Sequence, residues 1–466
     1  MALKHQDDFI SQTANIIQKR SKMNLTYNSL LACMGVSASL TAAVDTPNVI
    51  LIMTDDMGIE CLQAYGGETY STPNLNRLAQ DGLKFGHCYS QSLCTPSRVK
   101  IMTGRYNFRN YTKFKELDPR EVTFGHTARR AGYKTCVVGK WQLDGKVTDD
   151  FARVYGFDEY SLWYLNHDNF GSRFHDPIII ENGKKRTDTK GKYGPDIFSQ
   201  YAIDFVKKHK NQKFFLYYPM VLPHFPFVPT PDSPAWKEGN HKADNKYFVD
   251  MVNYMDKMVG NLVKTVDSLD LAENTVILFT SDNGTMRGLQ SIRNGQVIPG
   301  GKGYLKNIGN HVPFIARWKG RIKPGSTSNA LIDFSDFFVS INQLVGAANP
   351  ADRKIDGESF VPILLDPDKE VRQYTFSHYD PKWGTPEVGN FVRNKQYKLY
   401  GDGKLYDISK DEKETVELNP EAIPAAEINL LNSTMKTMKS QGSHLTVKRK
   451  DYPDPDKTKR PKKKKK

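Results

Sequence analysis

Short hydrophobic runs rich in β-forming residues recur along the chain, and turn residues and amphipathic helical patterns follow them. The runs that predict strands span residues 48–54, 133–138, 213–221 and 275–280. The helical patterns span residues 73–80, 197–209 and 247–269. At the first of these helices, Thr72 stands at the N-cap position and Pro73 at the first helical position, where both residue types are favoured. Strands that alternate with helices predict an α/β domain with a largely parallel sheet.

The pattern changes after about residue 371. Short strand-like pieces alternate with turns there, among them residues 391–392 and 397–400, and predict a small antiparallel subdomain. With 466 residues and 38% hydrophobic content, the chain is long enough for one large core and a smaller attached one. The expected organisation is a leader at residues 1–44, a main domain at 45–370, an α+β subdomain at 371–440 and a basic, disordered tail at 441–466.

The formal net charge of +14 is concentrated at the end of the chain. Residues 448–466 hold 11 Lys or Arg and 3 Asp, so the rest of the sequence is nearly balanced. A lysine run such as residues 462–466 is typical of a solvated terminal segment. Nucleic-acid binding would rest on this tail alone, so we expect no nucleic-acid partner.

The N-terminal segment has the layout of a secretory signal. Lys19, Arg20 and Lys22 precede a weakly apolar stretch that ends in small residues at Ala43, which predicts export and cleavage near that residue. A lipoprotein signal with acylation of Cys33 is the less favoured alternative. No later segment is long and apolar enough to span a bilayer. The sequence therefore predicts a secreted or periplasmic protein without a transmembrane segment.

Four cysteines remain outside the predicted leader: Cys61, Cys88, Cys94 and Cys136. Their spacing matches no zinc motif, and they are too few for a disulfide framework. At most one disulfide is expected among the others if Cys94 has another role.

Polar residues of chemical interest follow directly after the four predicted strands. They are Asp55 with Asp56, Lys140, His224, and Asp282 with Asn283. In open α/β sheets the carboxyl ends of the strands form the crevice where ligands bind, so we expect these side chains to converge. The carboxylate and amide oxygens among them suit a hard cation, Ca²⁺ or Mg²⁺, and calcium tolerates ligands from distant loops. Taken singly, each Asp or Asn is equally typical of a helix or turn cap.

A second set of residues is basic: Arg98, Lys140, His224 and Lys302. A metal and several cations in one cleft are what the hydrolysis of a tetrahedral oxyanion ester requires. Single basic residues are more often solvated surface groups, so the interpretation depends on their convergence. At this level the substrate is a sulfate or a phosphate ester, and the residues do not distinguish the two.

The segment from Leu93 to Arg98 reads Leu-Cys-Thr-Pro-Ser-Arg, and residues 101–105 follow as Ile-Met-Thr-Gly-Arg. This segment resembles the signature Cys-x-Pro-Ser-Arg of the sulfatase family, which is part of the alkaline phosphatase superfamily. The resemblance runs from about Pro47 to Asn419 and includes residues 48–56, 139–141, 223–224, 281–284, 301–303 and 405–407. It implies a large mixed, mostly parallel sheet flanked by helices, with a smaller C-terminal antiparallel-sheet subdomain.

The resemblance also implies a reaction. In the family, a maturation enzyme oxidises the signature cysteine to formylglycine, whose hydrated aldehyde is the nucleophile that attacks sulfur. Carried over to this chain, Cys94 becomes formylglycine. Residue 94, Asp55, Asp56, Asp282 and Asn283 would then hold one Ca²⁺.

The basic residues receive roles from the same resemblance. Arg98 would hold residue 94 in place, Lys140 and Lys302 would contact the sulfate oxygens, and His224 would protonate the leaving alcohol. One position departs from the family pattern. The family often has a histidine two residues after the lysine that Lys140 matches, whereas this chain has Gln142, which can hydrogen-bond a diol but cannot act as a base.

Two other functions stay open at this level. One is a phosphate mono- or diester hydrolase on the same fold, and the other is a catalytically silent protein that binds sulfated glycans. Aromatic and charged residues in segments 163–175 and 378–383 are candidates for a sugar pocket, and ordinary loop packing explains them equally well. Together with the predicted export, they favour a sulfated polysaccharide or its oligosaccharides as substrate, and a maturation enzyme as partner. The oligomeric state is not predicted.

Overall fold

The computed structural model describes residues 46–143, 151–163, 171–384 and 387–442. The predicted leader and the lysine-rich end of the predicted tail lie outside these residues, so export and cleavage near Ala43, or acylation of Cys33, stay predictions. In the part of the chain that is described, no helix combines the length and the hydrophobicity needed to cross a membrane.

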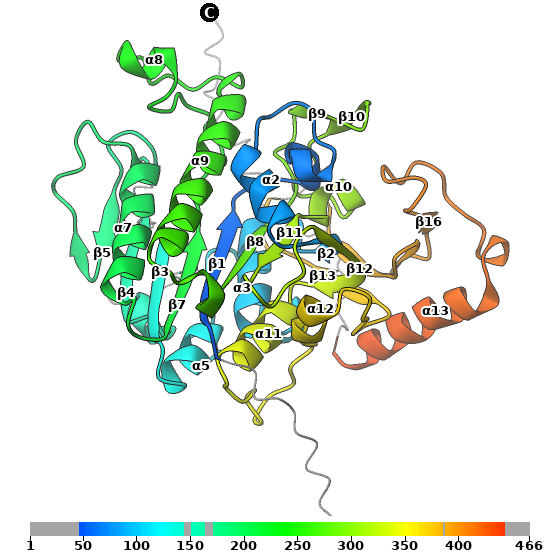
Figure 1. Cartoon of the computed structure of the whole chain (residues 1–466). Coiled ribbons are helices and arrows are strands. Elements are labelled where there is room, and N and C mark those ends of the chain that lie inside the picture. Colours follow the sequence, from blue (N-terminus) through cyan, green and yellow to red (C-terminus); the bar gives the residue numbers. More distant parts are fainter. Residues whose placement is uncertain (1–45, 144–150, 164–170, 385–386, 443–466) are drawn as a thin grey trace, which may run out of the picture. The chain divides into compact units, whose positions relative to one another are not determined.

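Ten strands of the described residues form the central sheet of the unit that begins at Thr46 (Figure 1). In spatial order they are β12 (Ser326–Asp333), β2 (Leu83–Tyr89), β11 (Phe314–Arg317), β8 (Thr275–Ser281), β1 (Asn48–Thr54), β7 (Phe214–Pro219), β3 (Lys134–Lys140), β4 (Glu159–Trp163), β5 (Ile179–Glu181) and β6 (Lys184–Lys185). The central strands β8, β1, β7, β3 and β4 are all parallel, whereas β11 and β5 are antiparallel to their neighbours. The predicted mixed, mostly parallel sheet is confirmed.

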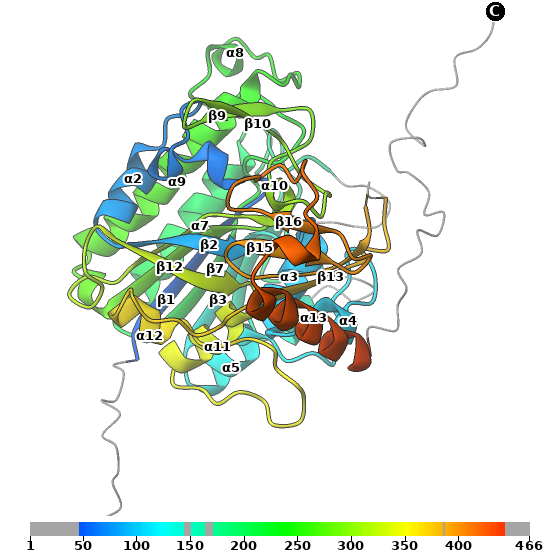
Figure 2. The same cartoon turned by 90° about the vertical axis from the view of Figure 1, so that its right-hand side faces the viewer.

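Helices cover both faces of this sheet (Figures 1 and 2). One face carries α2 (Pro73–Gln80), α7 (Gly194–Lys208) and α9 (Tyr247–Ser268), and the other carries α3 (Cys94–Thr103), α5 (Phe124–Arg130) and α11 (Asp336–Leu344). Because the central strands are buried on both sides, they read as uninterrupted hydrophobic runs in the sequence.

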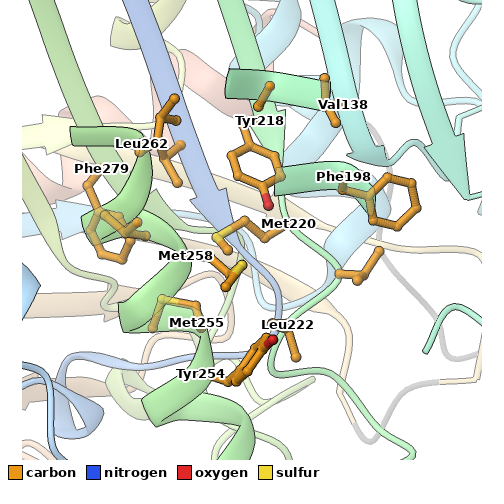
Figure 3. Packing of buried hydrophobic residues seen from close by; sticks show 14 of the residues in the cluster. Val138, Phe198, Tyr218, Met220, Leu222, Tyr254, Met255, Met258, Leu262 and Phe279 are labelled. Atoms are coloured by element: carbon orange, nitrogen blue, oxygen red, sulfur yellow. The ribbon is translucent and has the colours of Figure 1, made fainter. Parts of the chain in front are cut away.

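The side chains of β7 alternate between the two faces of the sheet. Tyr218 belongs to the cluster that packs under α7 and α9, where Met255 and Met258 of α9 also lie (Figure 3). Phe215 and Tyr217 point to the other face, and each lies 5.2 Å, centroid to centroid, from the ring of Phe124 in α5. Close packing on both faces holds the sheet rigidly, so the ends of its strands have defined positions.

The amino end of α2 is capped differently from the prediction. The helix begins where expected, but the Thr72 hydroxyl accepts a hydrogen bond from the Gln63 N–H (3.1 Å) and makes no cap bond. The Asp256 carboxylate of α9 instead accepts the backbone N–H groups of Asn74 (3.0 Å) and Leu75 (2.8 Å). A tertiary contact thus supplies the acceptor that the local sequence predicted at Thr72.

The subdomain predicted after residue 371 contains a four-stranded antiparallel sheet, against which α13 (Ala425–Ser440) packs (Figure 2). Its strands are β13 (Thr375–Tyr379), β14 (Gly389–Arg393), β15 (Tyr397–Tyr400) and β16 (Leu405–Asp407). A hydrophobic cluster that includes Val392, Leu399 and Leu431 lies between sheet and helix. The predicted antiparallel sheet is confirmed, and the domain boundaries stay predictions.

Shorter elements connect these parts. They are α4 (Asn107–Asn110), α6 (Phe151–Val154), α8 (Pro234–Lys237), α10 (Asn307–Asn310), α12 (Val361–Leu365), the hairpin of β9 (Gln290–Arg293) and β10 (Gln296–Pro299), and the 3₁₀ helices η1 (Ile59–Cys61), η2 (Gln63–Tyr65), η3 (Ala272–Asn274) and η4 (Pro420–Ala422). The four described cysteines, Cys61, Cys88, Cys94 and Cys136, are buried and free, so no disulfide forms among them.

Candidate active site

The polar residues singled out in the sequence converge at the carboxyl ends of parallel strands. β1 lies between β7 and β8, and β3 lies beyond β7, so the segments that follow these four strands share one edge of the sheet. Backbone hydrogen bonds join the segments. The Asp55 N–H donates to the Leu222 carbonyl (3.0 Å), and the Asp282 N–H donates to the Thr54 carbonyl (3.1 Å).

Cys94 is the first residue of α3, and all ten residues of this helix are buried. The preceding Leu93 is extended, so the chain enters the helix at Cys94 itself. The Cys94 Sγ lies 3.8 Å from Asp56 Oδ1. Burial raises the pKa of the Cys94 thiol to about 12, although Lys140 and Lys302 act in the opposite direction. The unmodified thiol therefore keeps its proton near neutral pH and is a weak nucleophile.

Three buried carboxylates pair with three cations around Cys94. The pairs are Lys140 with both oxygens of Asp55 (2.6 and 2.7 Å), Lys302 with Asp56 Oδ2 (2.5 Å) and Arg98 with Asp282 Oδ2 (2.8 Å). Arg98 also donates to the carbonyl of Lys140 (2.9 Å) and therefore links α3 to β3. Buried charges are tolerated only when they are paired, so these contacts make the cluster compatible with the fold.

The pKa values of the carboxyl groups diverge. Burial alone would raise the pKa of Asp55, but the basic groups around it, His224 and Lys140 first, hold it well below its usual range. Burial, and then the charge of Asp55, raise the pKa of Asp282 to about 7. Negative charge is thus crowded on one side of the cluster, and a bound cation would relieve this crowding.

The oxygen atoms at this point fit a hard divalent cation such as Ca²⁺. The Asn283 amide nitrogen donates to Asp56 Oδ1 (2.9 Å), while its Oδ1 is buried and accepts no hydrogen bond from any residue that the structure describes. A buried polar atom without a protein partner can be satisfied by a bound water or a metal ion. Potential ligand atoms of Asp55, Asp56, Cys94 and His224 lie within 4.8 Å of one another. Carboxylate and amide oxygens are the ligands that calcium prefers.

His224 lies at the mouth of the cluster, with 16% of its side chain exposed. Its Nδ1 lies 2.5 Å from the carbonyl oxygen of Phe225, and its Nε2 lies 3.1 Å from Lys302 Nζ and 3.5 Å from Asp56 Oδ2. Because a carbonyl only accepts, Nδ1 carries the hydrogen and Nε2 faces the lysine ammonium. Burial lowers the pKa of His224 well below its usual value.

Gln142 follows the end of β3 in a left-handed conformation (φ 58°) and is 8% exposed. Its Oε1 is buried and has no hydrogen-bond partner among the described residues. The path to this position depends on Gly139, which has φ 111° and approaches Pro219 so closely that a Cβ would lie 2.2 Å from the Pro219 oxygen. Gly139 thus lets β3 end at Lys140 in close contact with β7, and the left-handed conformation of the non-glycine residue Gln142 costs energy.

Arg173 is a residue at the site that sequence reasoning included only within the broad segment 163–175. Its NH1 lies 3.7 Å from Asp55 Oδ2. No short motif surrounds it, so its position was not readable from local sequence. The second broad segment, 378–383, divides in the structure: His378 is buried and hydrogen-bonds Asn390, whereas Trp383 is 36% exposed.

The mostly parallel sheet with helices on both faces defines an α/β fold of the alkaline phosphatase-like class, with this charged site at one edge of the sheet. Residues 47–347 match the family model of the sulfatases, and residues 301–441 match the model of the C-terminal part of N-sulphoglucosamine sulphohydrolases. The chain belongs to the sulfatase family and is a sulfuric ester hydrolase.

Similar proteins agree with this assignment. N-acetylgalactosamine-6-sulfatase of Homo sapiens is 30% identical over 370 residues, which cover 71% of this chain and 68% of that protein. N-acetylgalactosamine-6-O-sulfatase of Bacteroides thetaiotaomicron is 30% identical over 407 residues, which cover 70% of this chain and 78% of that protein. The fold is also that of a protein solved in complex with its substrate D-glucosamine-2-N,6-O-disulfate, with a TM-score of 0.71 and 22% identity over 86% of this chain and 99% of that one.

Proposed function

We propose that this chain hydrolyses sulfate esters of carbohydrates, with a formylglycine made from Cys94 as nucleophile and a calcium ion as cofactor. The observation that carries the proposal is the position of Cys94 beside Asp56, inside a cluster of three carboxylates and three cations. Conversion of the thiol requires a maturation enzyme that oxidises the side chain to an aldehyde. Hydration of this aldehyde then supplies two hydroxyl groups at residue 94.

The reaction has two steps at residue 94. In the first, one hydroxyl oxygen forms a bond to sulfur, the bond between sulfur and the sugar oxygen breaks, and the sugar alcohol leaves with a proton. In the second, the other hydroxyl loses its proton, the bond between the residue 94 carbon and the sulfated oxygen breaks, and sulfate leaves as the aldehyde re-forms. Water then hydrates the aldehyde again.

The basic residues divide the remaining work. Lys140 and Lys302 contact the sulfate oxygens and neutralise negative charge that develops in the transition state. His224 protonates the leaving alcohol, and the Lys302 ammonium, 3.1 Å from the His224 Nε2, is the donor that can supply it with this proton. Arg98, held by Asp282, fixes the orientation of residue 94.

Asp55, Asp56, Asp282, Asn283 and residue 94 would hold the calcium ion. When bound, calcium supplies positive charge for a sulfate oxygen and lowers the pKa of a nearby hydroxyl. The unpartnered oxygen of Asn283 is the atom of this structure that best supports the assignment.

Gln142 can donate a hydrogen bond to the hydrated aldehyde but cannot remove its proton. The elimination step therefore uses a base other than Gln142, or it runs more slowly. The buried, unpartnered Oε1 supports a role for Gln142 in holding residue 94 or the substrate.

A sulfated sugar is the favoured substrate. The first compound to test is 6-sulfated N-acetylgalactosamine, because two similar proteins are named as sulfatases of this sugar. A partly exposed pair of stacked aromatic rings supports a sugar as substrate. The rings of Phe114 and Trp383 stack with centroids 4.3 Å apart and an interplanar angle of 7°. The Lys115 N–H, next to Phe114, donates to the hydroxyl of Thr95, which follows Cys94. This contact supports a position of the pair near the site, where an aromatic face could stack on a sugar ring.

Trp383→Ala is expected to raise KM for a sulfated oligosaccharide by roughly threefold to tenfold, because the contact of a sugar ring with an aromatic face is lost. The kcat/KM for a small aryl sulfate is expected to stay unchanged. Steady-state kinetics with both substrates check this result. Val416→Ala, at an exposed hydrophobic residue of the same subdomain, is the control. Equal losses of kcat/KM on both substrates, or no loss on either, would contradict a role of Trp383 in stacking on the sugar.

The test of the proposed function is a comparison of esters of one alcohol. The protein, produced together with a formylglycine-generating enzyme, is assayed with the sulfate and the phosphate ester of the same phenol, and then with sulfated glycans. Faster sulfate release supports the proposal. Preference for the phosphate ester would replace it by a phosphate ester hydrolase. Binding of sulfated glycan without any release of sulfate would replace it by a silent glycan-binding protein.

A further inference from the structure

Arg173 lies beside Lys140 because of the register of the sheet. β3 and β4 are parallel neighbours, and Lys140 pairs with Trp163 in their register. The guanidinium of Arg173 lies over the Trp163 ring, 3.8 Å from its centroid. Both strands end at the edge of the sheet that carries Cys94, so this stack brings a further cation to the candidate active site.

The Arg173 guanidinium lies close to the charged residues around Cys94, but its NH1 donates no hydrogen bond to them. Arg173 NH1 lies 3.7 Å from Asp55 Oδ2, within ion-pair range but beyond hydrogen-bonding distance, and Lys140 donates to both oxygens of the same carboxylate. NH1 is buried and has no hydrogen-bond partner in the described part of the chain, and only 12% of the side chain is exposed. An unmet buried donor is costly, so a donor aimed into an active site indicates a ligand that satisfies it.

The balance of charge gives the chemistry of this ligand. Asp55, Asp56 and Asp282 each have a closer cation partner, so Arg173, whose NH1 lies 3.7 Å from Asp55, is a fourth cation beside three carboxylates. A guanidinium offers a planar fork of N–H donors that matches the oxygens of a tetrahedral oxyanion. The contact with the Trp163 ring fixes the orientation of the guanidinium plane.

We propose that Arg173 donates hydrogen bonds to the non-bridging oxygens of the sulfate group under attack. This inference rests on the proposed function, since it names a substrate contact in that site. Arg173 would add to Lys140 and Lys302 a third cationic contact to the sulfate, at a site where position 142 is neutral. A sulfate bound next to Arg173 would accept a hydrogen bond from NH1 and would lie close to Lys140.

Arg173→Ala is expected to lower kcat/KM for a small aryl sulfate on the order of tenfold to a hundredfold, because a charge-assisted hydrogen bond is lost. The inhibition constant of inorganic sulfate is expected to rise by a similar factor. Arg173→Lys retains the charge but not the fork, so it is expected to recover part of both losses. The control is Arg321→Ala, which also removes an arginine that lies over a tryptophan, Trp318. This pair follows β11, which is antiparallel to β8, so it lies at the end of the sheet away from Cys94.

The outcomes separate this inference from the function on which it rests. Thermal unfolding of each variant shows whether the fold is intact, and a folded Arg173→Ala with unchanged kinetics and unchanged sulfate inhibition would overturn the inference alone. A loss limited to oligosaccharides that carry a second acidic group would also overturn it, because Arg173 would then bind that group. If the unaltered protein releases no sulfate from any ester, the proposed function fails first.

Discussion

Replacement of Cys94 by alanine is expected to abolish sulfate ester hydrolysis, with a loss in kcat on the order of 10⁴-fold or more. The nucleophile is made from this side chain, so the substitution removes the hydroxyl groups that react. The fold is expected to persist, since alanine is tolerated at a small, buried helical position. Initial rates with an aryl sulfate check the result, and mass analysis of the unaltered protein tests whether position 94 carries an aldehyde.

Cys88→Ala is the matched control, because Cys88 is also buried and free but lies in β2, outside the cluster. It is expected to leave the rate unchanged. Two outcomes would sink the formylglycine mechanism. One is hydrolysis by Cys94→Ala at a rate near that of the unaltered protein. The other is an active protein in which position 94 is found only as the thiol, although a known sulfatase is converted in the same cells.

Asp55→Asn is expected to remove both activity and calcium binding. Asp55 accepts both hydrogen bonds of Lys140 and lies 3.6 Å from Arg98 NH2. Loss of its charge leaves buried cations uncompensated, which costs about 3–5 kcal/mol of stability. We expect kcat/KM to fall on the order of 10³-fold, and added Ca²⁺ to raise the unfolding temperature of the unaltered protein but not of the variant.

The stability effect has its own control. Asp336 and Arg372 form another buried ion pair, in which Arg372 Nε donates to Asp336 Oδ2 at 2.9 Å, outside the site. Asp336→Asn is expected to lower the unfolding temperature while calcium still stabilises the protein and the remaining folded fraction stays active. The metal assignment fails if Asp55→Asn still gains stability from Ca²⁺ or keeps the activity of the unaltered protein.

Local sequence predicted the elements that build the site with small errors at their ends. The runs at 48–54 and 275–280 became Asn48–Thr54 and Thr275–Ser281, and the run at 133–138 became Lys134–Lys140. These strands were readable because they are buried on both faces and so must be hydrophobic throughout. β11 and β12 were not predicted, because their signals are shorter or are mixed with polar residues at the edge of the sheet.

The same reasoning predicted which residues come together, because parallel strands end at a common edge. Asp55, Asp282 and Lys140 each follow or end such a strand, and the structure brings them together. Their roles as metal ligands or sulfate contacts stay predictions. The motif at Cys94 indicated the chemistry, but not that α3 starts at this residue.

The sequence by itself determined the parallel sheet, the edge at which its polar residues meet and the family motif at Cys94. Only the tertiary structure decided the partners: Lys140 with Asp55, Asp256 at the amino end of α2, and Arg173 over Trp163. Burial and strand order leave a periodic pattern in neighbouring residues, which local sequence records. A hydrogen bond or a stack between residues far apart in the chain depends on how packed elements approach one another, and no local pattern encodes that approach.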